Sequence, residues 1–473
     1  MPITRKQQIL TKRETTEGGG ATFAGSDAIQ VYDPSISDSV DQLDRSPAGP
    51  TLSRDFTPVG RKQRELTFTS DFRGSGTATT LPDWGPLLEA SGYKPDNADE
   101  QIQTVTLTGD PTASFQLGEQ ITQSAGTISA VIVGCFNASD VPQTTAAASS
   151  DYMVVVELIG SLVTDAATVG VGSGATSSLL TIADTSVHHS YMPTSAKLIQ
   201  ITDSGNWSSN PVVGDTLRIE RAGVLVGSGQ VIAVTATTAD IVLLTGSVAS
   251  GDVIKTGATT NGTLDADTVM TRTPSLAFRH NLDGRNRVLN GARATFSLAG
   301  EVGQPMAFTW TFQGDVGTDA DAAAVTTSNL GSTRAPRLLG AICAYGTGTD
   351  IRTLQTKSVS FDNGGTVAPN LDANSAGGST GANITDRDSA LSVTVDNTLG
   401  TVDWEALRDA GTAVRVGFVL GSTAGNIVSF VMPNCQVTEV SIGDSDGVST
   451  MDLTLRPRRL AESGDDEIFL SQL

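Results

Sequence analysis

The sequence predicts an all-β protein, and three observations lead to this fold class. Short segments in which apolar and polar residues alternate recur along the chain, as expected of half-buried strands. Charged residues make up only 17% of the chain, and Gly, Ser, Thr, Asn and Ala take their place, which is typical of a protein with many turns. Helical spacing is confined to two short stretches. We therefore expect a β-sandwich or barrel with a short flanking helix, not a helical or α/β enzyme.

The first segment, residues 1–60, is expected to form an extended N-terminal arm. It is polar, it is interrupted by Gly18, Pro34, Pro47 and Pro50, and it holds one short strand candidate at 28–32. Such a segment has little core of its own and gains order by lying on a neighbour. A disordered tail is the alternative.

A chain of 473 residues exceeds the size of a usual single core, so more than one domain is expected. Residues 61–104 and 270–473 are expected to form one discontinuous β-domain. The domain opens with an alternating strand and a short helix in which Trp84, Leu87 and Leu88 share one face. Its remaining elements are predicted strands at 64–72, 275–280, 288–298, 306–312, 358–361, 391–395, 413–420, 427–437 and 451–455, helices at 82–93 and 403–408, and polar loops at 314–336 and 363–383.

Two patterns in this domain give sharper expectations. The dipeptides Asp283-Gly284 and Asp446-Gly447 predict tight type I′ hairpin turns. In the strand at 306–312, Met306, Phe308, Trp310 and Phe312 form an apolar inner face. The opposite, wetter face of this strand carries Ala307, Thr309 and Thr311.

Residues 105–269 differ in texture and are expected to form an inserted β-rich domain or pair of domains. Aromatic residues are scarce there, and a weak repeat of a glycine, an acidic residue and an aliphatic residue occurs around Gly118, Gly214 and Gly251. A turn glycine that leads into an alternating strand, repeated, predicts small modules built of hairpins.

The charge balance and termini exclude several classes of protein. The formal net charge of −21 does not suit a free nucleic-acid reader, which needs a basic face. The basic N-terminus is not followed by an apolar signal region, and the most apolar run, at 152–159, contains Glu157 and is too short to span a bilayer. Three distant cysteines predict free thiols instead of a disulfide scaffold or zinc site.

No catalytic, cofactor or metal site is expected, so the chain is not predicted to be an enzyme. Residues 377–381 match GxSxG, but they lie in a polar loop without the strand and helix of a nucleophile elbow. The adjacent His188 and His189 would point to opposite faces of a strand. Asp444 and Asp446 resemble the start of a calcium loop that lacks its later ligands, and a hairpin turn explains them.

A charged cluster closes the chain. Basic and acidic side chains follow one another there, and their two readings are a solvated strand end and charge-complementary packing between subunits. The residues are Arg456, Arg458, Arg459, Asp465, Asp466 and Glu467.

Several blocks occur along the chain in a fixed order: residues 9–18, 27–31, 72–76, 82–92, 283–284, 290–296, 433–437, 444–448 and 464–467. In this order they resemble the opening arm, first strand and helix, central hairpin and closing strands of the tail tube (major tail) proteins of long-tailed bacteriophages. The resemblance covers nearly the whole chain except 105–269, which a minimal tube subunit would not need.

This resemblance implies a tail-tube-type β-domain whose subunits form hexameric rings that stack into a hollow tube. DNA would pass through the tube into the host without specific binding. The chain would be a virion protein assembled in the host cytoplasm, with itself, a tape measure protein and a tail terminator as partners, and with 105–269 on the outer surface of the tail. An acidic lumen would keep DNA from adhering.

The subunit-interface candidates follow from the helix, the hairpin turn and the charged cluster. They are Trp84, Leu87, Asp444, Asp446, Arg456, Arg458, Arg459, Asp465, Asp466 and Glu467. The alternatives are another virion component, such as a tail terminator, connector or head decoration, and a surface adhesin or carbohydrate-binding β-protein, which the Thr/Ser/Gly-rich segment suggests.

Overall fold

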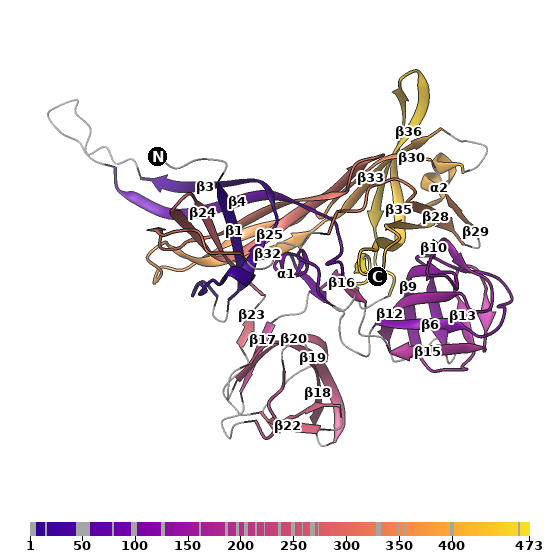
Figure 1. Cartoon of the computed structure of the whole chain (residues 1–473), viewed down its shortest axis with the longest axis horizontal. Helices are drawn as coiled ribbons and strands as arrows, with labels where there is room; N and C mark the ends of the chain where they lie inside the picture. The colour runs from indigo at the N-terminus through magenta and orange to yellow at the C-terminus, as the bar shows by residue number, and fades with distance from the viewer. Residues whose placement is uncertain are drawn as a thin grey trace.

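The computed structural model describes residues 6–473 except 15–16, 44–56, 78–79, 96–101, 124–127, 160–161, 185–187, 195–197, 203–206, 213–214, 222, 235–237, 247–250, 258, 265–269, 273, 328–332, 349, 354, 398–401 and 462–463. The described chain is dominated by antiparallel strands, which confirms the predicted all-β fold class (Figure 1). Its helices are α1 (Gly85–Glu89), α2 (Trp404–Ala410) and the 3-10 turn η1 (Gly25–Asp27).

One large antiparallel sheet, the main sheet, gathers strands from both ends of the chain. These strands are β1 (Gln7–Arg13), β2 (Ala28–Ile29), β3 (Tyr32–Gln42), β4 (Val59–Asp71), β5 (Tyr93–Pro95), β16 (His189–Pro193), β24 (Leu276–Leu282), β25 (Arg285–Glu301), β26 (Ala307–Val316), β27 (Ala320–Asp321), β28 (Ile342–Thr347), β29 (Asp350–Thr353), β30 (Thr356–Asp362), β33 (Ala390–Asp396), β34 (Ala413–Leu420), β35 (Val428–Ser445), β36 (Val448–Pro457) and β37 (Phe469–Gln472).

The 17-residue strand β25 organises the main sheet. One of its edges pairs with β26, which pairs in turn with β4 and then β3. Its other edge pairs with β24 over the first half and with β30 over the last residues. The sheet therefore divides into one branch that continues to β1 and β2, and another that continues through β33, β36, β35, β34 and β28 to β29.

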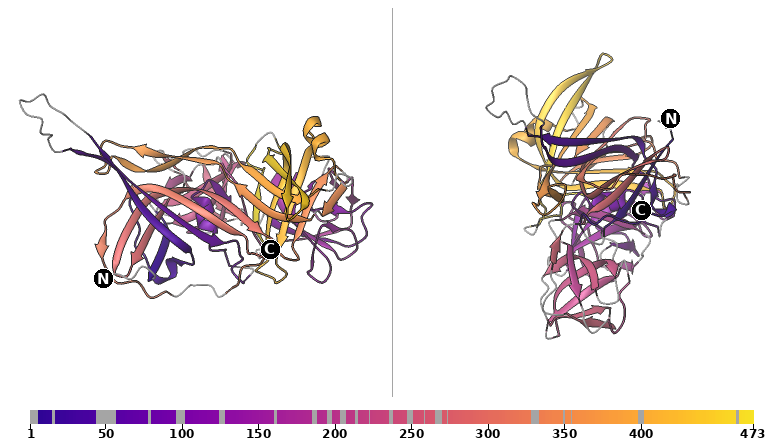
Figure 2. Two further views of the ribbon diagram at one scale, coloured as in Figure 1. Left: turned by 90° about the horizontal axis from the view of Figure 1, so that it is seen from above. Right: turned by 90° about the vertical axis from the view of Figure 1, so that its left-hand side faces the viewer.

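Both branches share one apolar core. Aromatic rings connect them, because Phe296 of β25 lies 6.0 Å from Phe361 of β30 between ring centroids, and Phe361 lies 5.0 Å from Phe430 of β35. Rings of this size bury more apolar area than any other side chain. The long strand β25 and its neighbours β24 and β26 extend along the long axis of the chain (Figure 2).

Two smaller modules interrupt the main sheet. The proximal module consists of β6 (Ile102–Leu107), β7 (Phe115–Gln116), β8 (Gln120–Gln123), β9 (Ile128–Phe136), β10 (Pro142–Gln143), β11 (Thr145–Ala146), β12 (Tyr152–Ile159), β13 (Thr168–Gly170), β14 (Thr176–Ser177) and β15 (Leu180–Asp184). The distal module consists of β17 (Leu198–Thr202), β18 (Thr216–Arg221), β19 (Val224–Val234), β20 (Thr238–Gly246), β21 (Val253–Thr256), β22 (Thr259–Thr263) and β23 (Met270–Arg272).

The two modules are attached differently. The core of the proximal module includes Val419, Val431 and Phe469 of the main sheet, so the two parts share buried apolar surface. Among the residues that the structure describes, the apolar core of the distal module consists of that module's own residues. Between the modules the chain returns to the main sheet as β16, which pairs with β5 and β37. The range 105–269 thus holds a main-sheet strand as well as small modules.

The weak sequence repeat corresponds to a recurring local structure. In each copy the backbone carbonyl of the acidic residue accepts a hydrogen bond from a following strand. Ile132 N donates to Glu119 O, Val231 N to Asp215 O, and Leu264 N to Asp252 O, each at 2.9 Å. The turn at Gly118 and Gly251 has positive φ, which glycine adopts without strain; Gly214 lies outside the described residues.

Several local expectations are confirmed. Asp283 and Gly284, like Asp446 and Gly447, have positive φ at both turn positions, as type I′ hairpins require. The helix predicted at 403–408 is present as α2, and Asp403 precedes it as a cap that accepts a hydrogen bond from Ala406 N. The apolar face predicted for β26 is fully buried, and its members are Met306, Phe308, Trp310 and Phe312.

Other expectations need correction. The predicted loop at 363–383 contains most of a hairpin, β31 (Gly365–Leu371) and β32 (Ser379–Arg387). Residues 7–13, expected as part of an extended arm, form β1, and its Ile9 and Leu10 are buried between neighbours in the main sheet. The helix predicted at 82–93 is shorter than expected, because α1 covers Gly85–Glu89.

Deletion of the distal module tests its independence. Leu198 pairs with Arg272, so a short Gly-Ser linker can join the flanking chain after removal of 198–272. We expect the remaining protein to unfold cooperatively at an unchanged Tm in differential scanning calorimetry, since no shared core is exposed. Removal of 102–184 is the matched control, because Gln103 and Asp184 also pair but the deletion uncovers Phe469. Equal damage by both deletions would contradict this account.

Candidate functional site

The outer strand of the main sheet, β3, is the candidate surface for assembly. It is an 11-residue strand that is exposed over most of its length. Among the described residues it pairs with β4 alone, so its second edge lies free of strand pairing. Tyr32 and Val40 are 42% and 41% exposed there. A long exposed edge of this kind is a template for another strand.

A buried arginine fixes β3 in this position. Arg64 of β4 has a side chain that is only 1% exposed. Its Nε donates to Asp38 Oδ1 of β3 at 2.6 Å, and its Nη1 donates to Asp319 Oδ1 at 2.6 Å. Arg287 of β25 also donates to Asp38 and to the backbone carbonyl of Ile36. This Arg64 cluster ties β3 to three other parts of the main sheet.

The charges of the cluster hold one another in the ionised state. Hydrogen bonds from Arg64 lower the pKa of Asp38 below its ordinary value. At Asp319, burial raises the pKa, but hydrogen bonds from Arg64 and from the backbone nitrogen of Val288 lower it, and the pKa is below its ordinary value. A buried cation with two ionised partners is a stable link only while both carboxylates stay charged.

The β35–β36 hairpin is a second exposed element, and it rises away from the body of the chain (Figure 1). Its outer residues, from 438 to 449, are mostly exposed, and Ile442 and Val448 are 70% and 54% exposed. Asp444 accepts a hydrogen bond from Gly447 N at 3.1 Å and closes the turn. Two strands without further cover are marginally stable in water, so this hairpin is suited to contact with another surface.

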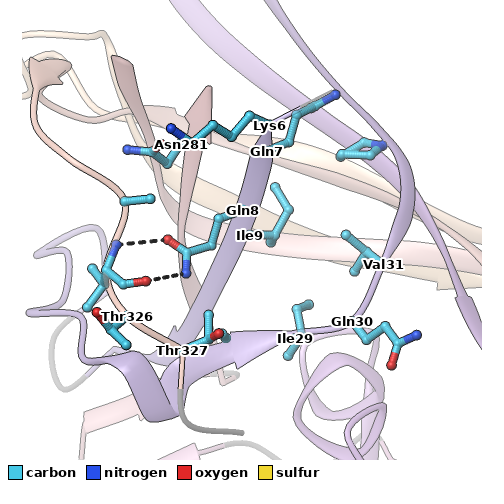
Figure 3. Close-up of a pocket in the computed structure, with 14 residues that line it drawn as sticks. Lys6, Gln7, Gln8, Ile9, Ile29, Gln30, Val31, Asn281, Thr326 and Thr327 are labelled. Atoms are coloured by element: carbon cyan, nitrogen blue, oxygen red, sulfur yellow. Dashed lines mark hydrogen bonds between the residues drawn. The ribbon is translucent and has the colours of Figure 1, made fainter. Parts of the chain in front are cut away.

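A groove beside β1 is the third element (Figure 3). Its cavity volume is about 590 Å³, and amide and aliphatic side chains line it, among them Gln7, Ile9, Ile29 and Val31. Gln8 fixes one wall, because its side-chain amide donates to Val325 O at 2.8 Å and accepts from Val325 N at 3.1 Å. Lys6 also lines the groove, and its amine forms an ion pair with Asp283 at 3.0 Å.

The predicted interface residues Trp84 and Leu87 lie in the core of the chain. Each is 1% exposed. Trp84 Nε1 donates to Arg73 O at 2.8 Å, and the Trp84 ring lies 5.2 Å from that of Tyr191. These side chains therefore anchor α1 to the main sheet instead of facing outward.

The closing charged cluster is largely paired within the chain. Glu467 and Asp465 accept from Arg387 at 2.6 and 3.4 Å, and Arg387 also lies over the ring of Tyr93. Asp466 is buried and accepts from the backbone nitrogens of Leu460 and Ala461.

The basic members of that cluster lie on the surface. Arg456 forms an ion pair with Asp388, whereas Arg458 and Arg459 are exposed. The residues of the closing charged cluster therefore do not form one site. Of the predicted acidic residues, Asp444 and Asp446 are exposed at the tip of the β35–β36 hairpin.

Other motifs also have structural settings. Ser379 of the GxSxG match lies at the start of β32, and its hydroxyl donates to Asp315 at 3.3 Å. Burial lowers the pKa of His188 to about 4, with its neighbour His189 contributing, so the imidazole is neutral near pH 7. Within the described ranges no group of three His, Cys, Asp or Glu side chains could hold a metal ion.

The Arg64 cluster was missed from the sequence, although one signal was present. Arg64 has the same parity as Leu66 and Phe68 in the alternating strand, so it falls on the buried face. A charged residue on that face needs a partner. Asp319 lies 255 residues away, and no local pattern could have paired it with Arg64.

No protein-family model matches the chain, and neither does any curated protein. None of the helices in the described part of the chain has the length and apolar character needed to cross a bilayer.

Replacement of Arg64 by methionine tests the link to β3. The change leaves Asp38 and Asp319 without their shared cation, so we expect a loss of about 2 kcal/mol in the free energy of unfolding. Urea titration followed by circular dichroism measures it. Arg64→Lys is the matched control, since it retains the charge but not the planar fork, and should lose less. An unchanged stability in Arg64→Met would contradict the assigned role.

The pH dependence of that difference is a separate test. The lowered pKa values of Asp38 and Asp319 contribute stability above their unfolded pKa of about 3.9. That contribution is lost as the pH falls through the lower folded values. The gap in stability between the wild-type protein and Arg64→Met should thus be constant from about pH 5 to pH 7 and narrow below about pH 4. A gap that widens with acid would refute the assignment.

Proposed function

We propose that this chain is a structural subunit that assembles into stacked rings and so builds a tube, as in the phage tail tubes that its sequence blocks resemble. The observation that carries the proposal is β3, a long strand held at the margin of the main sheet with its second edge free of described strand pairing. The proposal makes the chain a virion protein of the tail, assembled in the host cytoplasm.

The free edge of β3 supports the proposed assembly. Unpaired backbone groups on an exposed edge strand bond to water, and they are a ready template for a strand of another chain. The Arg64 cluster keeps β3 aligned with β4, so a strand of a second copy can extend the sheet without rearrangement. When such a contact joins two different surfaces, repetition closes a ring if the rotation fits. Closure into one barrel leaves no free edge.

The charge of the chain suits a conduit for DNA. The net charge of the chain is −21. Like charges repel a polyanion and keep it from adhering to the wall. The proposed lumen is net negative, and DNA passes through it without specific binding.

The proposal also includes partner proteins at the ends of the tube and a position for the two inserted modules. The ends of a tube need other proteins, and the resemblance implies a tape measure protein and a tail terminator. The distal module has a core of its own, as expected of a decoration. The proposal places both modules on the outer surface of the tail, where they do not obstruct the bore.

Negative-stain electron microscopy of the purified protein tests the proposal. We expect rings with a central hole, or stacks of such rings, and no retention of duplex DNA by these particles at physiological salt. Isolated monomers at high protein concentration would contradict the proposal. Rings that bind DNA tightly would refute the acidic lumen but leave the ring assembly standing.

A further inference from the structure

A pocket next to the N-terminal segment is lined by a cation that has no ion-pair partner among the described residues. The pocket has a cavity volume of about 590 Å³ and lies between residues 19–23, the start of β25 and residues 318–322. Its wall is mostly apolar or small, with Ala21, Phe23, Val288 and Ala320 among the lining residues. Arg279 of β24 is the charged residue among the described residues that line it.

The guanidinium of Arg279 is held in place but not neutralised. Its central carbon lies 5.4 Å from the centre of the Phe23 ring, a cation–π distance. Its Nε and Nη2 have no hydrogen-bond partner among the described residues. Burial lowers its pKa, and no described acidic neighbour acts in the opposite direction. Because Arg279 lines the pocket, this half-buried cation favours a carboxylate that enters it.

The tip of the β35–β36 hairpin has the complementary character. It presents two exposed carboxylates, Asp446 in the turn itself and Asp444 at the end of the strand before it. The aliphatic side chains of Ile442 and Val448 are exposed next to them. The hairpin tip is therefore acidic and apolar, whereas the pocket is cationic and apolar.

The two surfaces also lie in the right places to join different copies. β24 and the tip of the β35–β36 hairpin lie toward opposite ends of the long axis of the chain (Figure 1). They cannot meet within one chain in this fold, but a head-to-tail neighbour brings one to the other. Contacts of this heterologous type generate rings when they close.

We propose that the acidic tip of the β35–β36 hairpin of one copy docks into the Arg279 pocket of the next copy. A tip carboxylate pairs with the guanidinium, and the exposed aliphatic side chains cover the apolar wall and Phe23. The pairing sets the register between neighbouring copies, as charge complementarity does at other interfaces. This contact rests on the proposed function, because it is one of the joints of the proposed ring.

Charge reversal on each side, followed by their combination, tests the contact. Arg279→Glu places an acid opposite the acidic tip, and the double variant Asp444→Arg with Asp446→Asn makes the tip basic while Asn keeps the left-handed turn. Each alone should lower the fraction of protein in rings, measured by sedimentation and negative-stain microscopy, by about tenfold or more, because like charges then face each other. The three changes together should restore most of that assembly.

Controls separate misfolding from loss of the contact. Circular dichroism and the Tm of the unassembled fraction show whether each variant is folded. The double reversal Arg408→Glu with Asp409→Lys on the exposed face of α2 should leave assembly unchanged.

The outcomes are distinguishable. Full assembly of either one-sided variant, or loss of assembly in folded one-sided variants without any restoration in the combination, overturns the contact. Absence of rings in the wild-type protein overturns the proposed function as well.

Discussion

The backbone of an edge strand needs hydrogen-bond partners, and the exposed strand β3 imposes this requirement on the whole architecture. The Arg64 cluster prevents β3 from leaving the sheet, since Asp38 of β3 and Asp319 share one buried guanidinium. A strand that is fixed and exposed at the same time favours association over local collapse. The long strand β25 connects the two branches of the main sheet, because it pairs with β24, which leads to β1, and with β30, which leads to the β35–β36 hairpin.

Much of the fold could be predicted because its signals are local. Two Asp-Gly turns, the short helix α2 and the apolar face of β26 each depend on neighbours within a few residues. The strands β1, β31 and β32 were missed because Gly, Asn, Thr and Gln hide their alternation. Contacts between residues far apart in the sequence could not be predicted. Trp84 packs in the core against Tyr191, and Glu467 accepts a hydrogen bond from Arg387 of the same chain.

The two inserted modules show how the same local unit can be used in two ways. Both contain the acidic turn whose carbonyl receives a following strand. The proximal module shares its core with the main sheet, and Arg415 lies 3.7 Å from its Glu119. The distal module keeps a separate core. Changes in the distal module therefore leave the buried surface of the main sheet untouched, whereas changes in the proximal module reach β35 and β37.

Hydrogen–deuterium exchange of β3 in unassembled and assembled protein tests the central claim most directly. The claim that the free edge of β3 is used for assembly predicts that backbone amides of residues 32–42 gain strong protection in the assembled form. In unassembled protein, the amides of this strand that do not bond to β4 should exchange rapidly. Equal exchange of this strand in both forms would contradict the account, even if particles formed.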